Sequence, residues 1–275
     1  MRVILHCCVV AALVLAGAPV HALESFVLYD NFNATSINPV KWTGFEFVGL
    51  GTEANRSIDT AMGELRMTYR AFGNTTSNSG QTFSGFGLLL SKNTTAIKAL
   101  QTQVEVLTAQ ATDCAGNSAT TLSRAGLRGS FFNTGSPMSG GSATNDVHAL
   151  LFLRRIPTDP SNDLRVLAQV FRCTNQLCSQ VDSLKQADLG TATTGQLIQL
   201  QIEWDQPNKR FLFQRGTNAK VAISYAPLSS TAAPSVALKA LELAHSVENC
   251  TTTPRPVGFL DVVFDDVRVN QSASP

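Results

Sequence analysis

The stretch IEWDQPNKRFLFQRG, residues 202–216, has the pattern of two β-strands joined by a tight turn. Before the turn, apolar and polar residues alternate, which places Ile202 and Trp204 on the same side of an extended chain. Pro207 cannot donate a hydrogen bond to a sheet, and the short polar residues around it favour a turn. The stretch therefore predicts a β-hairpin with Trp204 in the core.

The same stretch also holds two acids, Glu203 and Asp205, that are two residues apart. A glycosidase needs two carboxyl groups that flank the scissile bond at a separation of about 5–10 Å, and alternate residues of a strand can provide them. Here the third position on that face is Asn208, and Pro207 ends the strand before it. We therefore interpret the two acids as part of the hairpin and not as a catalytic pair.

Strand-like runs recur along the whole chain and are separated by clusters of Gly, Asn, Ser and Pro, which is typical of an all-β protein. Many strands with one apolar face indicate two packed sheets or a barrel. The exception is Ala237–Ala244, for which either a short helix or an irregular crossover is expected. The predicted strands are 25–32, 45–49, 64–72, 82–90, 99–112, 123–133, 146–156, 165–172, 179–186, 196–205, 210–216, 220–226 and 258–269.

The N-terminal segment has the features of a secretory signal peptide. Arg2 precedes an apolar stretch over residues 3–18, and Val-His-Ala at 20–22 is a small-residue cleavage pattern. A membrane anchor is the alternative, but the apolar run is shorter than about 20 residues and contains a histidine. We therefore expect a signal peptide over 1–22, one β domain over 23–275, and secretion. No later run is long enough to span a bilayer.

The charge balance excludes one class of partner. Without Arg2, the remaining chain has 20 basic and 20 acidic residues and is formally neutral. It has no basic stripe, and its aromatic residues do not alternate with Lys or Arg. Nucleic-acid binding is therefore not expected.

Four cysteines follow the expected cleavage site, and in an exported chain they predict two disulfide bonds with three possible pairings. Cys173 and Cys178 enclose four residues between two strand-like runs, so a bond across the end of that hairpin is expected. Cys114 and Cys250 then form the second bond. A zinc site is the alternative, but CxxxxC is a loose spacing and no histidine stands in a ligand pattern beside it.

Four short motifs resemble one superfamily. A strand ending in IEW with its polar turn and aromatic-rich return strand resembles the core hairpin of the concanavalin A-like lectins and glucanases, including laminarinase-type and lichenase-type enzymes. YDNFNATSINPVKW at 29–42, MGELRM at 62–67 and FDDVRV at 264–269 resemble its opening segment, its first core strand and its closing strand. The resemblance implies a jelly-roll β-sandwich of two antiparallel sheets over nearly all of the mature chain.

The resemblance also indicates what is missing. In those glucanases the catalytic acids form a Glu-x-Asp-x-x-Glu motif on a strand of the concave sheet. The strand here that best takes that place, SRAGLRGSFFN at 123–133, contains no carboxylate. Without a proton donor and a nucleophile the family's mechanism cannot run. We therefore expect a secreted lectin-like module that binds a carbohydrate or cell-surface glycan and has no enzymatic activity.

Three residues are predicted to contact the ligand: Arg124, Arg128 and His148. The two arginines fall on one side of their strand and could face acidic sugars. Polysaccharide lyases of the same superfamily use Arg, Gln, His and Tyr in this way, but their Tyr-x-Lys-x-Gly-x-Tyr strand is missing here. The alternatives to a lectin are therefore a hydrolase or lyase with a divergent site, or a structural or adhesive surface protein.

The resemblance also implies a structural calcium ion. In the glucanases an Asp at the position of Asp265 and a backbone oxygen at the position of Gly63 hold calcium on the convex side. Oxygen ligands suit this ion. The alternative is that Asp265 and its neighbour Asp266 are solvated acids.

Overall fold

The structure is a computed structural model that describes residues 25–47, 51–135 and 141–274. The segment expected to be a signal peptide, 1–22, lies outside the described residues. The described chain forms β-strands and one short 3-10 helix, η1 (Gln271–Ala273). The strands are β1 (Phe26–Asp30), β2 (Trp42–Phe47), β3 (Glu53–Asp59), β4 (Glu64–Phe72), β5 (Gln81–Leu90), β6 (Ala99–Ala111), β7 (Leu122–Asn133), β8 (Asp146–Arg155), β9 (Asp163–Cys173), β10 (Val181–Thr193), β11 (Leu197–Asp205), β12 (Arg210–Arg215), β13 (Val221–Ser224), β14 (Lys239–Glu248) and β15 (Val257–Asn270).

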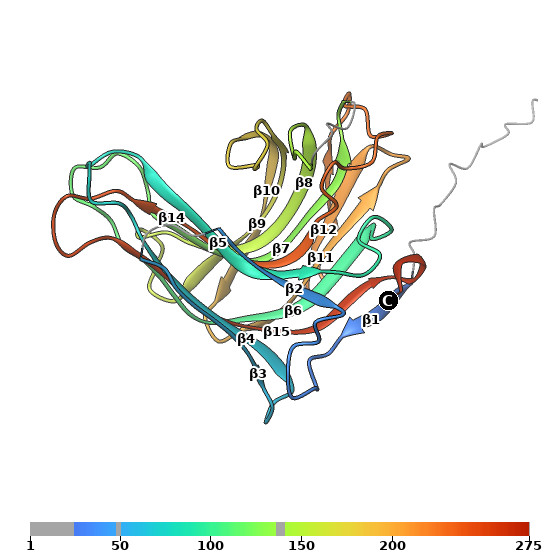
Figure 1. Ribbon diagram of the computed structural model, residues 1–275, viewed down its shortest axis with the longest axis horizontal. Helices are drawn as coiled ribbons and strands as arrows, with labels where there is room; N and C mark the ends of the chain where they lie inside the picture. The colour runs from blue at the N-terminus through green and yellow to red at the C-terminus, as the bar shows by residue number, and fades with distance from the viewer. Residues whose placement is uncertain (1–24, 48–50, 136–140, 275) are drawn as a thin grey trace, which may run out of the picture.

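The strands form two antiparallel sheets that pack face to face (Figure 1). The eight-stranded sheet has the order β13-β12-β11-β6-β15-β4-β3, with β1 paired to the end of β15. The seven-stranded sheet has the order β10-β9-β8-β7-β14-β5-β2. The predicted all-β sandwich of two antiparallel sheets is confirmed. Among the described residues, no helix has the length and apolarity needed to cross a bilayer.

The hairpin of β11 and β12 forms as the sequence predicts. Ile202 on β11 is fully buried between the sheets, and Trp204 is half-buried, with its indole nitrogen 3.0 Å from the hydroxyl oxygen of Tyr225. In the turn, Asp205 accepts hydrogen bonds from the Asn208 amide at 2.9 Å and from the Arg210 guanidinium at 2.6 Å. Asp205 is therefore bound within the turn.

Glu203 also makes contacts within the sheet. It lies on the outer face of β11 with only 4% of its surface exposed, and it forms an ion pair with Lys220. Gln201 donates a second hydrogen bond to the same carboxylate oxygen. Glu203 faces away from the other sheet, which supports the interpretation that it is not half of a catalytic pair.

The helix or crossover expected for Ala237–Ala244 is wrong, because Lys239–Glu248 forms β14 in the middle of the seven-stranded sheet. β14 pairs with β7 on one side and β5 on the other. Leu241 and Leu243 are fully buried on the inner side. Sheet pairing on both edges has therefore overridden the helix-forming composition of this segment.

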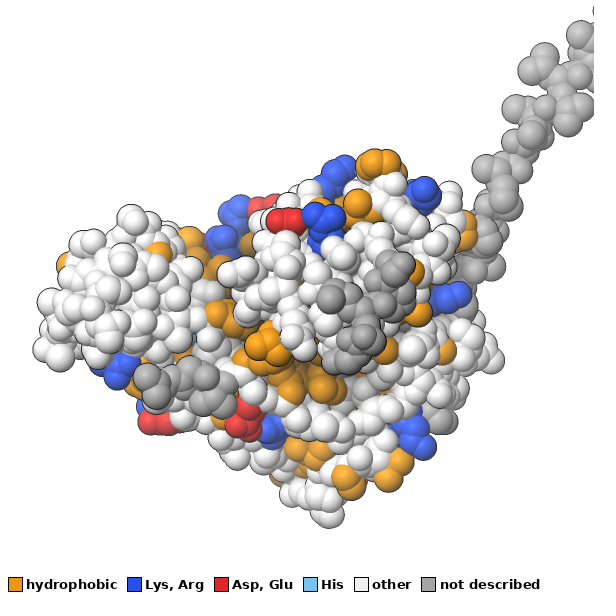
Figure 2. All heavy atoms as spheres, turned by 45° about the horizontal axis from the view of Figure 1, so that its top comes forward, with side chains coloured by type: hydrophobic (Ala, Val, Ile, Leu, Met, Phe, Trp, Pro, Cys, Tyr) orange, Lys and Arg blue, Asp and Glu red, His pale blue; other side chains and the backbone are white. Residues whose placement is uncertain are grey.

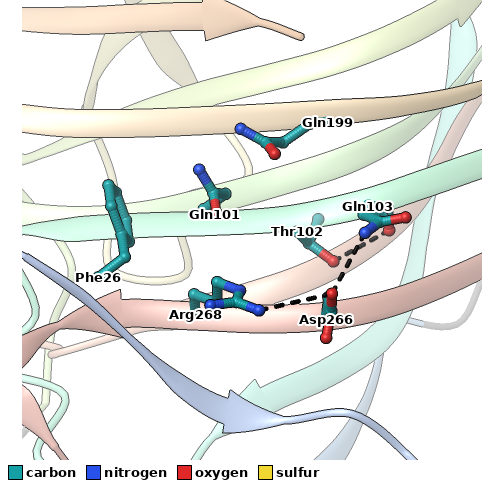
Figure 3. Close-up of a pocket in the computed structure, with 7 residues that line it drawn as sticks. All are labelled: Phe26, Gln101, Thr102, Gln103, Gln199, Asp266 and Arg268. Carbon is teal, nitrogen blue, oxygen red and sulfur yellow. Dashed lines mark hydrogen bonds and ion pairs between the residues drawn. The ribbon is translucent and has the colours of Figure 1, made fainter. Parts of the chain in front are cut away.

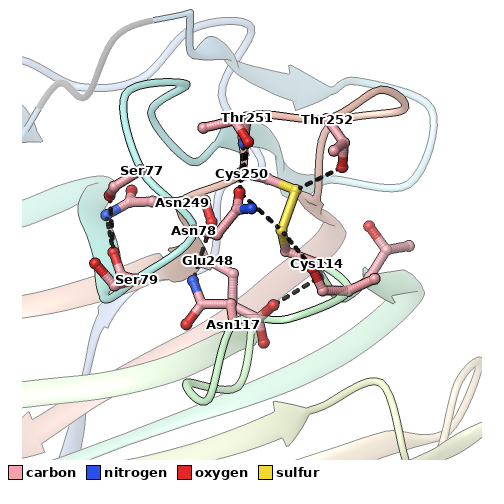
Figure 4. The surroundings of a disulfide bond; sticks show 12 residues. Ser77, Asn78, Ser79, Cys114, Asn117, Glu248, Asn249, Cys250, Thr251 and Thr252 are labelled. Carbon is pink, nitrogen blue, oxygen red and sulfur yellow. Dashed lines mark hydrogen bonds between the residues drawn. A yellow bond between two sulfur atoms is a disulfide. The ribbon is translucent and has the colours of Figure 1, made fainter.

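Two disulfide bonds close loops at different places, and they join the pairs expected from the sequence. Cys173–Cys178 spans the connection between β9 and β10. Cys114–Cys250 joins the segments that follow β6 and β14 (Figure 4). Beside it, the Glu248 carboxylate accepts a hydrogen bond from the backbone N–H of Cys114 at 2.5 Å. The second bond thus ties the two sheets together at one end of the sandwich.

His245 on β14 is fully buried on the inner face. Its Nδ1 is 2.9 Å from the Ser123 hydroxyl and its Nε2 is 3.2 Å from the backbone oxygen of Tyr69, on whose ring it stacks at 4.9 Å. Burial is the main cause that lowers the pKa of His245 to about 4. The ring is therefore neutral in the folded protein at neutral pH.

This shift predicts that stability falls in mild acid. Between pH 6.5 and pH 4 the unfolded chain takes up a proton at His245 that the folded protein does not bind, so folding becomes less favourable as the pH falls. We expect this residue to account for about 3 kcal/mol of lost stability at pH 4. Chemical denaturation at pH 7 and pH 4 measures the loss. His245→Gln should show a correspondingly smaller difference, and an unchanged difference would contradict the assignment.

Candidate functional site

The outer face of the seven-stranded sheet carries a groove of about 420 Å³. One wall comes from β2 and β5 through Phe47 and Phe83, and the other comes from the β9–β10 connection through Leu177. Because regions from both edges of one sheet line the same groove, this face is concave, as the curvature of the ribbon shows (Figure 1). Phe47, Phe83 and Leu177 are 41%, 40% and 75% exposed. The groove therefore offers apolar surface to solvent, and Figure 2 shows hydrophobic side chains gathered beside charged ones.

The aromatic wall follows from alternation along two neighbouring strands. Phe45 and Phe47 both point outward from β2, with their ring centroids 5.6 Å apart. Phe47 lies opposite Gly85 of β5, where an added Cβ atom would be 3.3 Å from the Phe47 ring. The missing side chain at this position lets the ring lie against the neighbouring strand.

The bottom of this face is an ionic cluster, which we call the concave floor: Arg124, Arg128, Glu242 and His148. Glu242 of β14 pairs in register with Gly126, midway between the two arginines of β7. Each of its carboxylate oxygens accepts one hydrogen bond, from Arg124 at 3.0 Å and from Arg128 at 2.9 Å. The register of β7 against β14 therefore produces a three-charge cluster with a net charge of one positive unit.

Aromatic rings hold the two guanidinium groups from their other sides. The Arg124 guanidinium lies 5.8 Å from the centre of the Phe83 ring and 5.4 Å from that of Phe152. The Arg128 guanidinium lies 5.6 Å from the Phe171 ring. Cation–π contacts of this kind are stronger where water is excluded. The arginines are therefore fixed in position, and Arg128 also lines the groove.

Glu242 stays ionised. Burial disfavours its charge, but the charges and hydrogen bonds of Arg128 and Arg124 outweigh burial and lower its pKa below the usual 4.5. The general acid of a glycosidase needs the opposite shift, because it must hold a proton near neutral pH. Glu242 is therefore suited to holding the arginines and not to protonating a leaving group.

His148 is buried next to the groove. Its Nδ1 accepts a hydrogen bond from Arg128 Nε at 3.4 Å, its ring stacks on Phe171 at 5.0 Å, and its Nε2 has no partner among the described residues. Burial, and then the charges of Arg128 and Lys239, lower its pKa well below 6.5. A ring nitrogen of His148 and the sulfurs of Cys173 and Cys178 lie within 4.8 Å of one another. Both sulfurs are in a disulfide, so they are not available as metal ligands.

The structure brings together all three residues predicted as ligand contacts, but in a more buried position than expected. Arg128 and His148 are nearly inaccessible, and Arg124 is partly covered. Sequence reasoning missed Glu242, because its strand was expected to be a helix or crossover. It also missed the aromatic wall, whose members lie on two strands. Alternation of Leu241, Glu242 and Leu243 is the signal that could have identified the strand.

The residues implied for calcium lie at the end of the paired region of β4 and β15. Gly63, with φ of 73°, precedes β4, and Asp265 follows the last pair between β4 and β15. The side-chain oxygen of Asn33 lies so close to Gly63 that an added Cβ atom would be 2.1 Å from it. Burial, and then the charges of Asp266 and Asp30, raise the pKa of Asp265. Oxygen donors with an excess of negative charge fit a calcium ion.

Comparisons with known proteins give structural neighbours only. No protein-family model matches the chain, and no curated protein matches its sequence. Similar solved structures include SCLam, a non-specific endo-beta-1,3(4)-glucanase from family GH16 (12% identity, TM-score 0.48, 91% of this chain and 94% of that one). They also include the catalytic domain of a laminarinase from Thermotoga petrophila (11% identity, TM-score 0.45, 90% of this chain and 100% of that one).

A third similar structure is the carbohydrate recognition domain of Emp46p in its potassium-bound form (9% identity, TM-score 0.40, 86% of this chain and 96% of that one). These three structures are two glucanases and a carbohydrate recognition domain. At these identities and TM-scores, no residue role is carried from them to this chain.

Proposed function

We propose that this protein is a secreted glycan-binding module without enzymatic activity, and that its ligand lies in the groove of the concave face. The observation that carries the proposal is the exposed wall of Phe47 and Phe83 above the fixed charges of the concave floor. Aromatic rings stack on the apolar faces of sugars, while charged and polar groups fix orientation. Two disulfide bonds suit an oxidising, extracellular compartment.

The absence of catalysis rests on the chemistry of the concave floor. Its carboxylate, Glu242, is ionised, forms ion pairs with two arginines and has a lowered pKa. Its histidine, His148, is buried and neutral. The three tyrosines of the chain, Tyr29, Tyr69 and Tyr225, are all buried in the core, so none reaches the groove as the tyrosine of a lyase would. These groups can hold a ligand, but they do not form an acid–base pair.

Removing either aromatic ring of the groove should weaken glycan binding. Phe47→Ala and Phe83→Ala are each expected to cost about 1–2 kcal/mol of binding free energy, or about 5- to 30-fold in Kd. The measurement is a glycan array on the disulfide-intact protein, with neutral and acidic glycans, followed by calorimetry on the glycan that binds best.

Phe259→Ala is the matched control for this test. Phe259 is a half-buried ring on the outer face of the other sheet, beneath Arg70 at 5.1 Å. Its removal should leave the affinity unchanged. If a folded sample binds no glycan, a protein partner or a structural role replaces this proposal. If the groove variants bind glycan as well as the control does, the groove is not the binding site.

We also propose that a calcium ion stabilises the junction of β4 and β15 through Asp265 and the backbone oxygen of Gly63. Support comes from the oxygen donors gathered there and from the raised pKa of Glu64, which is caused by burial and then by the charge of Asp265. A cation would offset this repulsion between carboxylates.

Calcium should therefore raise the melting temperature, and chelation should lower it. Saturation at about 100 times the Kd would stabilise the fold by about 2.7 kcal/mol. Thermal unfolding with calcium, with magnesium and with chelator measures this effect. Asp265→Asn should abolish the calcium response, while Asp188→Asn, at an exposed ion pair, should retain it. Equal melting temperatures with calcium and with chelator would refute the site.

A further inference from the structure

A second hollow, of about 340 Å³, lies on the outer face of the eight-stranded sheet, on the side of the molecule opposite the groove. We call it the amide pocket. Its side chains come from β1, β15, β6 and β11 and converge on one space (Figure 3). The residues that define it are Phe26, Gln101, Gln103, Gln199, Asp266 and Arg268.

A bulge in β15 shapes one side of this pocket. The pairing of β15 with β6 shifts between Asp265 and Arg268, and Asp266 has a φ of 47°, in the left-handed region. Val267 is then turned inward and fully buried, while Asp266 and Arg268 remain partly exposed on the outer face. Bulges often re-aim side chains beside binding sites, and a non-glycine residue in this region carries backbone strain. The bulge therefore presents two charged side chains to the pocket, at a local cost in backbone strain.

Hydrogen bonds within the sheet orient the amide groups. Gln103 donates to the Asp266 carboxylate at 3.2 Å, and Gln101 donates to Gln201 at 2.6 Å. Gln201 in turn donates to Glu203, which is paired with a lysine. Each of these NH₂ groups uses one of its two donors within the sheet, so Gln101 and Gln103 are oriented, and each can offer an oxygen and one N–H to a ligand.

The remaining groups add hydrogen-bond donors without adding net charge. The Gln199 side chain has no hydrogen bond to any described residue, so both its donor and its acceptor are available. Asp266 and Arg268 lie 3.6 Å apart and cancel each other's charge. The half-buried ring of Phe26 closes one end. Mixed donors and acceptors beside an aromatic ring match the hydroxyl groups and apolar faces of an uncharged sugar.

The spacing of polar groups across the strands suits an extended chain of sugars. Arg268, Gln101, Gln201 and Gln214 stand in register on β15, β6, β11 and β12. Neighbouring strands are about 4.8 Å apart, close to the length of one pyranose unit in an extended glycan. Gln201 is buried and bonded to Gln101 and Glu203, so it supports the row from within the sheet. A ligand that crosses the strands would meet the partly exposed members of the row, which are Arg268, Gln101 and Gln214.

We propose that the amide pocket is a second binding site, for a neutral, extended glycan chain that runs across the strands of the eight-stranded sheet. This inference goes beyond the groove, because it places a separate site on the opposite face of the molecule. One protein molecule would then hold two glycan chains, or two parts of one polymer, on its two faces.

The test is calorimetric titration of the full secreted protein with two neutral probes, laminarihexaose and cellohexaose, in three groups of variants. Phe47→Ala/Phe83→Ala disables the groove, and Gln199→Ala or Phe26→Ala disables the amide pocket. Phe259→Ala, on the same face outside the pocket, is the control. We expect the groove variant to bind at least one hexasaccharide, with affinity reduced tenfold or more by Gln199→Ala or Phe26→Ala and less than twofold by Phe259→Ala.

Two results would overturn the proposal: a groove variant that binds neither hexasaccharide, or binding that the pocket variants leave unchanged. The first result, combined with a wild-type protein that binds glycans on the array, leaves the groove as the sole site. If only Gln199→Ala or Phe26→Ala abolishes binding, the amide pocket is supported as a binding site and the groove is rejected as one. Shortening the probe from six sugars to two should weaken binding at the amide pocket, because fewer strands are contacted.

Discussion

Glu242→Gln is expected to lower the free energy of unfolding by about 3–5 kcal/mol, because it leaves two buried guanidinium groups without their counter-charge. The substituted side chain keeps the size and shape of glutamate, so the loss measures charge and not packing. Arg128, with a side chain 7% exposed, has little access to water that could compensate. Denaturant titration at pH 7 measures the effect. Glycan binding in the groove should weaken as well, since Arg128 loses a partner that orients it.

An exposed ion pair provides the control for this prediction. Asp188 pairs with Arg165, and both side chains are more than two-fifths exposed. Asp188→Asn should therefore change stability by less than about 1 kcal/mol. A loss of similar size from the two substitutions would show that the concave floor is hydrated and that its charges are not held by the fold.

Removing the Cys114–Cys250 bond is expected to destabilise the protein by about 5 kcal/mol. The two cysteines are 136 residues apart, and the entropy that a cross-link removes from the unfolded chain grows with the length of the closed loop. Cys114→Ala/Cys250→Ala should therefore unfold at a much lower denaturant concentration than the wild type. The loss should be partly local, because Glu248 and Asn249 at the same end accept hydrogen bonds from the segment that contains Cys114 (Figure 4).

The second disulfide is the internal comparison. Cys173 and Cys178 are only 5 residues apart, and the same relation gives about 2 kcal/mol for Cys173→Ala/Cys178→Ala. That variant should affect the groove more than the fold, since the bond holds the loop that carries Leu177. Equal losses of stability from the two double variants would contradict the loop-length explanation.

Most strands could be predicted from the sequence because one of their faces is apolar, with β14 as the exception. β11 alternates Leu200 and Ile202 with polar residues, and the structure buries these two residues fully. β3 (Glu53–Asp59) was missed, because it pairs on only one side and most of its side chains are exposed. Its sequence has no apolar stripe to detect. A strand without an apolar stripe is therefore one that this pattern does not identify.

The site was predictable only in part, for a physical reason. Arg124 and Arg128 could be assigned to one face of one strand from their spacing of four residues. Glu242 reaches them from β14, whose Ala, Leu, Lys and Glu residues favour a helix in isolation. Phe47 and Phe83 meet only because β2 and β5 pair. Register between distant strands created the site, and no local pattern encodes that register.

The pairing of β1 with the end of β15 has a mechanical consequence. The backbone N–H of Gln271 donates to the Ser25 carbonyl oxygen at 2.8 Å, so the two ends of the domain are adjacent. A pulling force applied at both ends would break the hydrogen bonds of this strand pair one after another, at low force. Extension would then stop at the Cys114–Cys250 bond, which carries the load and shields residues 115–249 from it. A surface protein with this arrangement would yield early under tension, while the load would bypass β7–β10 and β14 of the concave sheet.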